Sequence, residues 1–97
     1  MAKKSTRFDE PLALEALTDT NLFSLARVLN EYGEEDGTFY KIDAPAVAHV
    51  KRCIRAGAVI PAGKPGHWKL SPAGRELLRE WSARHDPAGK YPGPRFL

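Results

Sequence analysis

The segment Pro61-Ala62-Gly63-Lys64-Pro65-Gly66 limits the possible folds more than any other part of the chain. Two prolines that lack an N–H and two glycines that tolerate positive φ exclude a helix here and favour the tip of a tight hairpin. The short apolar run Ala58-Val59-Ile60 precedes it, and His67-Trp68-Lys69-Leu70 follows with alternating polar and apolar side chains. This pattern predicts two strands, with the apolar residues of the second facing a core and His67 and Lys69 facing outward.

Residues 44–57, on the N-terminal side of the hairpin, have the pattern of an amphipathic helix. Asp43 is a possible N-cap, Pro45 is tolerated in the first turn, and Gly57 is a natural end. At about 100° per residue, one side of this helix forms an apolar stripe of the width that a core-facing helix shows. The stripe consists of Ala46, Val47, Val50, Cys53, Ile54 and Ala58. The opposite side has three permanent cations and no acid, and consists of Ala48, His49, Lys51, Arg52, Arg55 and Ala56.

Another helix is predicted directly after the hairpin. Ser71 is a good N-cap, and Pro72 has the φ angle of the first helical position. We expect its buried side to consist of Ala73, Leu77, Leu78 and Trp81. Residues 85–97 are rich in proline and glycine after His85, which predicts an extended tail. The apolar side chains of this tail, Tyr91, Phe96 and Leu97, either pack on the domain or contact a partner.

The N-terminal part of the chain predicts an arm and two helices. Residues 1–8 are polar and basic without periodicity, which is typical of a flexible arm. Asp9 is a possible cap for a first short helix, which has an apolar side of Leu12, Leu14 and Leu17. Residues 18–20 interrupt that pattern and supply new caps for a longer helix, predicted to end at Tyr32 before Gly33.

The longer helix has apolar residues at three- and four-residue spacing, namely Leu22, Leu25, Ala26, Leu29 and Tyr32. We place Asn21, Ser24, Arg27 and Glu31 on its solvent side. Phe23 and Val28 lie off the stripe, so we expect them to contact the first helix or another subunit. Residues 34–37 then predict a turn, and residues 38–42 predict either a short strand or a single helical turn.

These elements predict one domain that is mainly α with a small β-hairpin, an α+β fold resembling a winged helix over residues 9–84. No apolar run approaches the ~20 residues of a membrane span and no signal peptide is visible, so we expect no membrane contact and a cytoplasmic location. Cys53 is the single cysteine, and the three histidines lack metal-ligand spacing. With no catalytic motif in the chain, we expect no metal, no cofactor and no enzymatic activity.

Charge is distributed unevenly along the chain. Residues 1–43 hold five Lys/Arg and nine Asp/Glu, whereas residues 44–97 hold ten Lys/Arg and three Asp/Glu. A basic C-terminal half within one domain predicts a basic face directed at a polyanion and an acidic face elsewhere. A basic helix face with small residues between its cations suits recognition of double-stranded DNA.

The run from Val50 to Ile60, the Gly/Pro hairpin and the segment Leu70-Ser71-Pro72-Ala73-Gly74-Arg75-Glu76-Leu77-Leu78 resemble winged helix-turn-helix regulators of the MarR and PadR type. The resemblance covers roughly residues 20–82 and implies that helix 44–57 reads DNA and that Lys64 is the wing tip. In that family a complete helix precedes the reading helix. Here only residues 34–43 are available, so the first half of the helix-turn-helix is shortened or replaced.

We therefore expect a small DNA-binding protein, a transcriptional regulator of the compact kind that prophages and mobile elements carry. Helix 44–57 and wing 61–69 would contact DNA through His49, Lys51, Arg52, Arg55, Lys64, His67 and Lys69. Because a reading helix commonly works as one of a symmetric pair, we also expect a homodimer. The alternative is a protein-interaction winged helix, an adaptor or inhibitor of a larger complex. It would engage its partner through Phe23, Val28, Tyr91 and Phe96.

Overall fold

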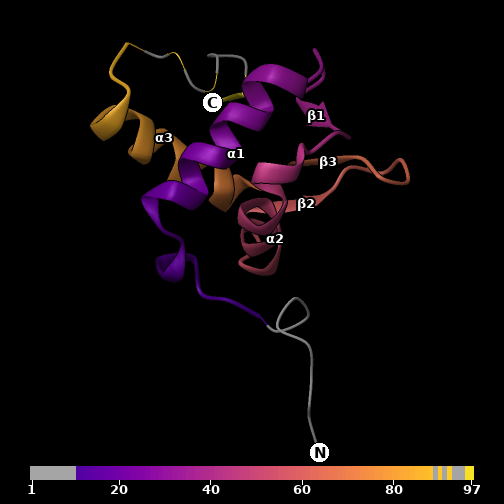
Figure 1. The fold of residues 1–97 in the computed structure, drawn as a ribbon, viewed down its shortest axis with the longest axis horizontal. Helices are drawn as coiled ribbons and strands as arrows, with labels where there is room; N and C mark the ends of the chain where they lie inside the picture. The colour runs from indigo at the N-terminus through magenta and orange to yellow at the C-terminus, as the bar shows by residue number, and fades with distance from the viewer. Residues whose placement is uncertain (1–10, 89, 91, 93–95) are drawn as a thin grey trace, which may run out of the picture.

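The fold is taken from a computed structural model, which describes residues 11–88, 90, 92, 96 and 97. Within these residues three α-helices pack on one face of a small antiparallel sheet (Figure 1), which confirms the predicted α+β class. The elements are α1 (Asp19–Tyr32), β1 (Thr38–Phe39), α2 (Val47–Arg55), β2 (Val59–Pro61), β3 (Trp68–Leu70) and α3 (Pro72–His85). Two 3₁₀ turns, Leu14–Ala16 and Ala44–Ala46, precede α1 and α2. The predicted arm, residues 1–8, lies outside the described residues.

The sheet has the strand order β1-β3-β2, with both pairs antiparallel. The predicted hairpin is confirmed, and Val59 pairs with Leu70 at its base. Of the two structures predicted for residues 38–42, a strand or a helical turn, the strand forms. It is short, and β1 pairs with β3 through Thr38↔Lys69 and Phe39↔Trp68. Alternation places Phe39, Trp68 and Leu70 on the face toward the helices, and Lys69 on the opposite face.

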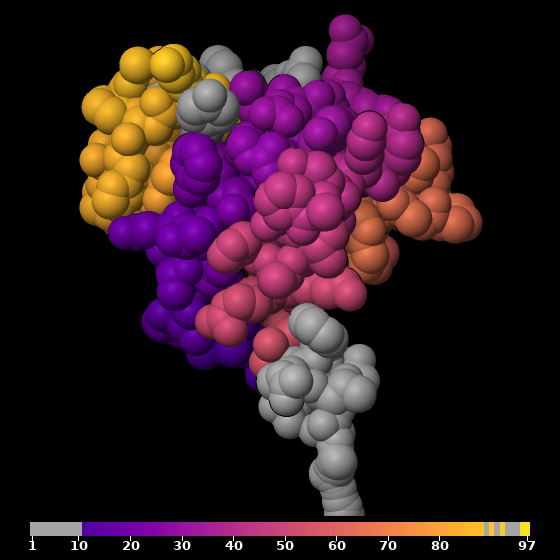
Figure 2. Space-filling model, in the orientation of Figure 1, coloured from indigo at the N-terminus to yellow at the C-terminus, as the bar shows by residue number. Residues whose placement is uncertain are grey.

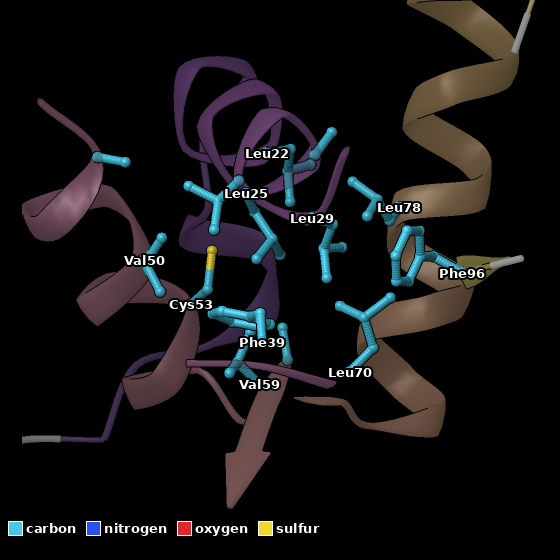
Figure 3. Packing of buried hydrophobic residues seen from close by; sticks show 14 of the residues in the cluster. Leu22, Leu25, Leu29, Phe39, Val50, Cys53, Val59, Leu70, Leu78 and Phe96 are labelled. Atoms are coloured by element: carbon cyan, nitrogen blue, oxygen red, sulfur yellow. The ribbon is translucent and has the colours of Figure 1, made fainter. Parts of the chain in front are cut away.

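α1 begins and ends where the sequence predicts. The Thr18 hydroxyl accepts from the Asn21 N–H at 3.1 Å, and the Asn21 side chain accepts from the Thr18 N–H at 2.9 Å, so the two form a capping box. However, Asn21, Ser24 and Val28 are buried. The predicted exposure of Asn21 and Ser24 is wrong, and of the two contacts predicted for Val28 the one with another subunit is excluded. The reason is that α1 packs between α2 and α3 (Figures 1 and 3), so both flanks of its apolar stripe are covered as well.

The core forms where the three helices meet the inner face of the sheet. Figure 3 shows Leu22, Leu25 and Leu29 of α1 directed toward side chains of α2, the strands and α3. Their partners include Val50, Cys53, Phe39, Val59, Leu70 and Leu78. Burial raises the pKa of the Cys53 thiol to about 12, so this cysteine is a protonated core residue at neutral pH.

α3 is anchored to the end of α2 by Ser71 and Gly74. The Ser71 hydroxyl donates to the Gly57 carbonyl at 2.5 Å and accepts from the Gly74 N–H at 3.0 Å. A Cβ at Gly74 would overlap the Ala58 carbonyl oxygen, so the two backbones approach as closely as only glycine permits. The prediction of Ala73 as a buried residue is wrong, because Gly74 faces α2 and turns its neighbour to solvent.

Two helix starts differ from the prediction. Residues 11–13 are not helical, and the Leu12 N–H donates to the Arg55 carbonyl at 3.2 Å, so this segment covers the end of α2 instead of forming a helix from Asp9.

Asp43 does not cap the following helix through its side chain. Its carboxylate instead accepts from Arg27 of α1 at 3.0 Å, and this pairing raises the pKa of the Arg27 guanidinium. The predicted helix 44–57 is divided into the 3₁₀ turn Ala44–Ala46 and the shorter α2.

Phe96, the residue before the last one, packs inside the fold, with its ring against Gly33 at the end of α1. Of the two options for the tail, the described part therefore shows packing on the domain. Val28 and Phe96 are both unavailable to a protein partner, and Tyr91 lies outside the described residues. None of the helices in the described part of the chain is long and apolar enough to cross a bilayer.

Gly74→Ala tests the contact between α3 and the end of α2. Alanine favours a helix by about 1 kcal/mol over glycine, yet we expect the free energy of unfolding to fall by about 1–3 kcal/mol because the added methyl meets the Ala58 backbone. Urea denaturation measures the change. Arg75→Ala, at the exposed neighbouring position, is the matched control and should change stability by less than about 0.5 kcal/mol. Unchanged or higher stability in Gly74→Ala would contradict the close approach.

Candidate nucleic-acid interface

The outward side of α2 carries Ala48, Lys51 and Arg55, which share one helix face at i, i+3 and i+7. Ala48 and Lys51 are exposed and Arg55 is half-buried. The apolar side of the same helix, with Val50 and Cys53, lies in the core. In Figure 2, α2 and the hairpin lie next to each other on the face that is shown, and the hairpin projects beyond the body of the molecule.

The other two predicted α2 residues, His49 and Arg52, are attached to α1. Arg52 donates through Nε to Asn21 Oδ1 at 3.0 Å and through a terminal nitrogen to the Ala16 carbonyl at 2.9 Å. The His49 ring lies 2.8 Å from Asn21 through its Nδ1. The structure thus divides the four residues into an outward pair and a pair that connects two helices.

The contacts of Asn21 determine the proton position on His49. Asn21 Oδ1 accepts from the Thr18 N–H and from Arg52 Nε, so the amide nitrogen Nδ2 is the group that faces His49. Because Nδ2 is a donor, His49 Nδ1 accepts, and the neutral ring carries its proton on Nε2. His49 therefore presents a hydrogen-bond donor on the side away from Asn21.

The hairpin positions its cations away from the core. Lys64 is exposed in the loop between β2 and β3, and Lys69 is exposed on the outer face of the sheet beside Thr38 and Ile60. His67 is half-buried, and its ring stacks on Tyr40 with 5.3 Å between centroids.

One acidic residue lies near the wing. Hydrogen bonds from the Thr38 hydroxyl and N–H lower the pKa of Asp36, and the charge of Lys64 lowers it further. Asp36 therefore stays ionised at neutral pH and offsets part of the positive charge of the wing tip.

Two residues of this region were not predicted as part of it. Tyr40 is 60% exposed and extends the outer face of the sheet next to His67. The sequence indicates this placement through strand alternation, because Tyr40 lies two residues after Thr38 and therefore points to the same face of the sheet. Asn21 is 3% exposed. Its position three residues after Thr18 in the sequence predicts a role in the capping box, but nothing in the sequence indicates its contacts with α2.

The described residues contain no group of three or more His, Cys, Asp or Glu side chains that would hold a metal ion. The basic surface contains long cationic side chains, small residues between them and exposed ring edges. These groups bind anions and flat ring systems through charge and stacking.

Asn21→Ala tests the polar link between α1 and α2. The substitution removes the partner of Arg52 Nε and His49 Nδ1, so we expect the free energy of unfolding to fall by about 1–3 kcal/mol. Asn30→Ala, at an exposed asparagine of the same helix, is the control and should change stability little. Thermal denaturation of both variants measures the effect, and equal stabilities would show that the link contributes nothing.

Comparison with known proteins gives no relative that explains this surface: no family model, no curated protein and no solved structure matches the chain.

Proposed function

We propose that this chain binds double-stranded DNA, with α2 in the major groove and the hairpin along the phosphate backbone. The observation that carries the proposal is the charge of one continuous segment. Residues 44–75 contain six Lys/Arg and no Asp/Glu, and they fold into α2, the hairpin and the start of α3. The apolar residues of this segment face the core. A segment that holds cations and no acids attracts a polyanion.

The outward side of α2 suits the major groove, which is about 12 Å wide and admits one helix. Lys51 and Arg55 are one turn apart, and Ala48 leaves room for the backbone to come close to the bases. Arginine and lysine pair with guanine O6 and N7, or with phosphate oxygens. Lys64 and Lys69 of the hairpin then meet phosphates beside the groove.

His49 and Arg52 act differently in this proposal from the outward pair. Their contacts with Asn21 and the Ala16 carbonyl fix the rotation of α2 about its axis, which decides that Lys51 and Arg55 point outward. A direct contact of His49 Nε2–H or Arg52 with DNA stays a prediction. His67, stacked on Tyr40, likewise stays a predicted phosphate contact.

α1 supports α2 in this arrangement. In a helix-turn-helix protein a first helix crosses the backbone and holds the reading helix in the groove. Here α1 packs directly on α2, with only β1 and a 3₁₀ turn between them in the sequence. This packing supports the proposal that α1 replaces the shortened first half of the motif.

The proposal predicts salt-dependent binding that depends on α2. Selection from a random duplex pool, followed by fluorescence anisotropy, should give a preferred sequence whose affinity falls steeply with salt. Arg55→Ala should cost about 1–3 kcal/mol at the selected site and less on random DNA. Lys64→Ala should weaken both equally and reduce the slope of log K against log salt by about one.

Arg84→Ala is the matched control, because it removes an exposed arginine near the end of α3. It should bind DNA like the parent protein. Failure of the parent protein to bind any duplex at low salt would overturn the proposal, as would equal losses in the Arg84 and Arg55 variants.

Regulation of transcription, a homodimer and a cytoplasmic location stay predictions. A symmetric pair would place two α2 helices about 34–36 Å apart on DNA, and sedimentation of the protein with and without a selected duplex measures the stoichiometry.

A second candidate function is that of an adaptor or inhibitor of a larger complex. The observation that favours it is Phe23, which is 44% exposed although it is a large apolar residue. A protein from the native host that binds the parent and the Lys51→Ala/Arg55→Ala variant equally, but not Phe23→Ala, would favour this candidate over DNA binding.

A further inference from the structure

A groove lies between the start of α1 and the end of α3. Figure 1 shows that these two helix ends lie away from the hairpin. Asp19, Thr20 and Phe23 line one side, and Trp81, His85 and Asp86 line the other. Its volume is about 470 Å³, within the range of about 300–1,000 Å³ that small-molecule sites occupy. The DNA-binding proposal uses none of these residues.

Aromatic rings form the walls of the groove. The Trp81 ring lies 6.3 Å from the Phe23 ring and 5.6 Å from the His85 ring, measured between centroids. Trp81 is 4% exposed, and its Nε1–H is buried without a hydrogen-bond partner in the described part of the chain. Solvent does not reach this N–H, so it is not part of the groove surface.

The charged groups at the groove attract positive charge. Asp19 and Asp86 contribute carboxylates, and the last turn of α3 directs its carbonyl groups toward the same end. His85 Nε2 lies 3.5 Å from Asp19, so a protonated His85 partly neutralises that carboxylate. When the imidazole is neutral, the groove combines aromatic faces with two carboxylates, and these are the groups that bind organic cations.

We propose that this groove binds a small organic cation that has an apolar body. The positive group lies over the exposed Phe23 ring close to Asp19, and the apolar body packs along the accessible edge of Trp81. Binding at this groove is independent of the DNA surface, because its residues belong to other parts of α1 and to the end of α3.

Benzoylcholine is a suitable probe, and 3,3-dimethylbutyl benzoate is its uncharged carbon analogue. Trp68→Phe leaves Trp81 as the only indole, so one N–H resonance in a ¹H–¹⁵N spectrum reports on the groove. Titration should shift this resonance saturably at millimolar concentrations or below. The uncharged ester should bind at least about fivefold more weakly.

Variants separate the groove from non-specific association. In the Trp68→Phe background, Phe23→Ala and Asp19→Asn should each weaken benzoylcholine binding by about two- to fivefold. Tyr40→Ala, at the other strongly exposed aromatic residue, should not change it. Phe23→Ala and Asp19→Asn should keep the affinity of the parent for DNA.

Three results would overturn the proposal. The indole resonance does not move, or both esters bind equally, or a second copy of the chain already fills the groove. The last case would appear as a parent dimer that Phe23→Ala converts to a monomer. Loss of DNA binding in Lys51→Ala/Arg55→Ala would leave the cation site unaffected, so the two proposals fail separately.

Discussion

The contact between the start of α3 and the end of α2 fixes the arrangement of everything that follows α2. Gly57 ends α2 with a φ of 77°, the chain returns through the hairpin, and Ser71 closes the loop by a hydrogen bond to the Gly57 carbonyl. Gly74 then allows the α3 backbone to lie against Ala58. A side chain at Gly74 would press α3 away from Ala58 and loosen the packing beside Leu78, so glycine at this position lets α3 lie close to the end of α2.

A second constraint acts on the rotation of α2. Its apolar side alone leaves a wide range of possible rotations, because Val47 and Ile54 on one flank are only half-buried. The polar link from Asn21 to His49 and Arg52 removes this freedom on the other flank. A buried amide with every contact satisfied favours a single rotamer set, whereas apolar packing alone tolerates several. The direction of Lys51 and Arg55 therefore depends on a residue of α1.

Local features of the fold were predictable, because the sequence encodes them over a few residues. The Thr18 and Ser71 caps, the ends at Gly33 and Gly57, and the hairpin each need only neighbouring residues. The burial of Asn21, Ser24 and Val28 was not predictable from helical periodicity, since it depends on the elements that pack against α1. Asn21, for example, is buried at its contacts with His49 and Arg52 of α2.

The same limit applies to the basic surface. A helical wheel places His49, Arg52, Lys51 and Arg55 on one side of α2, but it does not contain α1. Only the three-dimensional packing shows that two of the four are attached to Asn21 and the Ala16 carbonyl. Asp43 was misassigned for a similar reason. Its carboxylate competes between the nearby backbone and a guanidinium sixteen residues away, and the charged partner wins.

The hairpin can change in length without disturbing the rest of the domain. Its register is set at the base by Val59↔Leu70 and by the pairing of β3 with β1, while its tip holds only exposed or half-buried residues. Residues added to or removed from the tip in pairs would therefore leave the core and the anchoring of α3 intact. The reach of the hairpin is thus a variable that evolution or an engineer can adjust without refolding the domain.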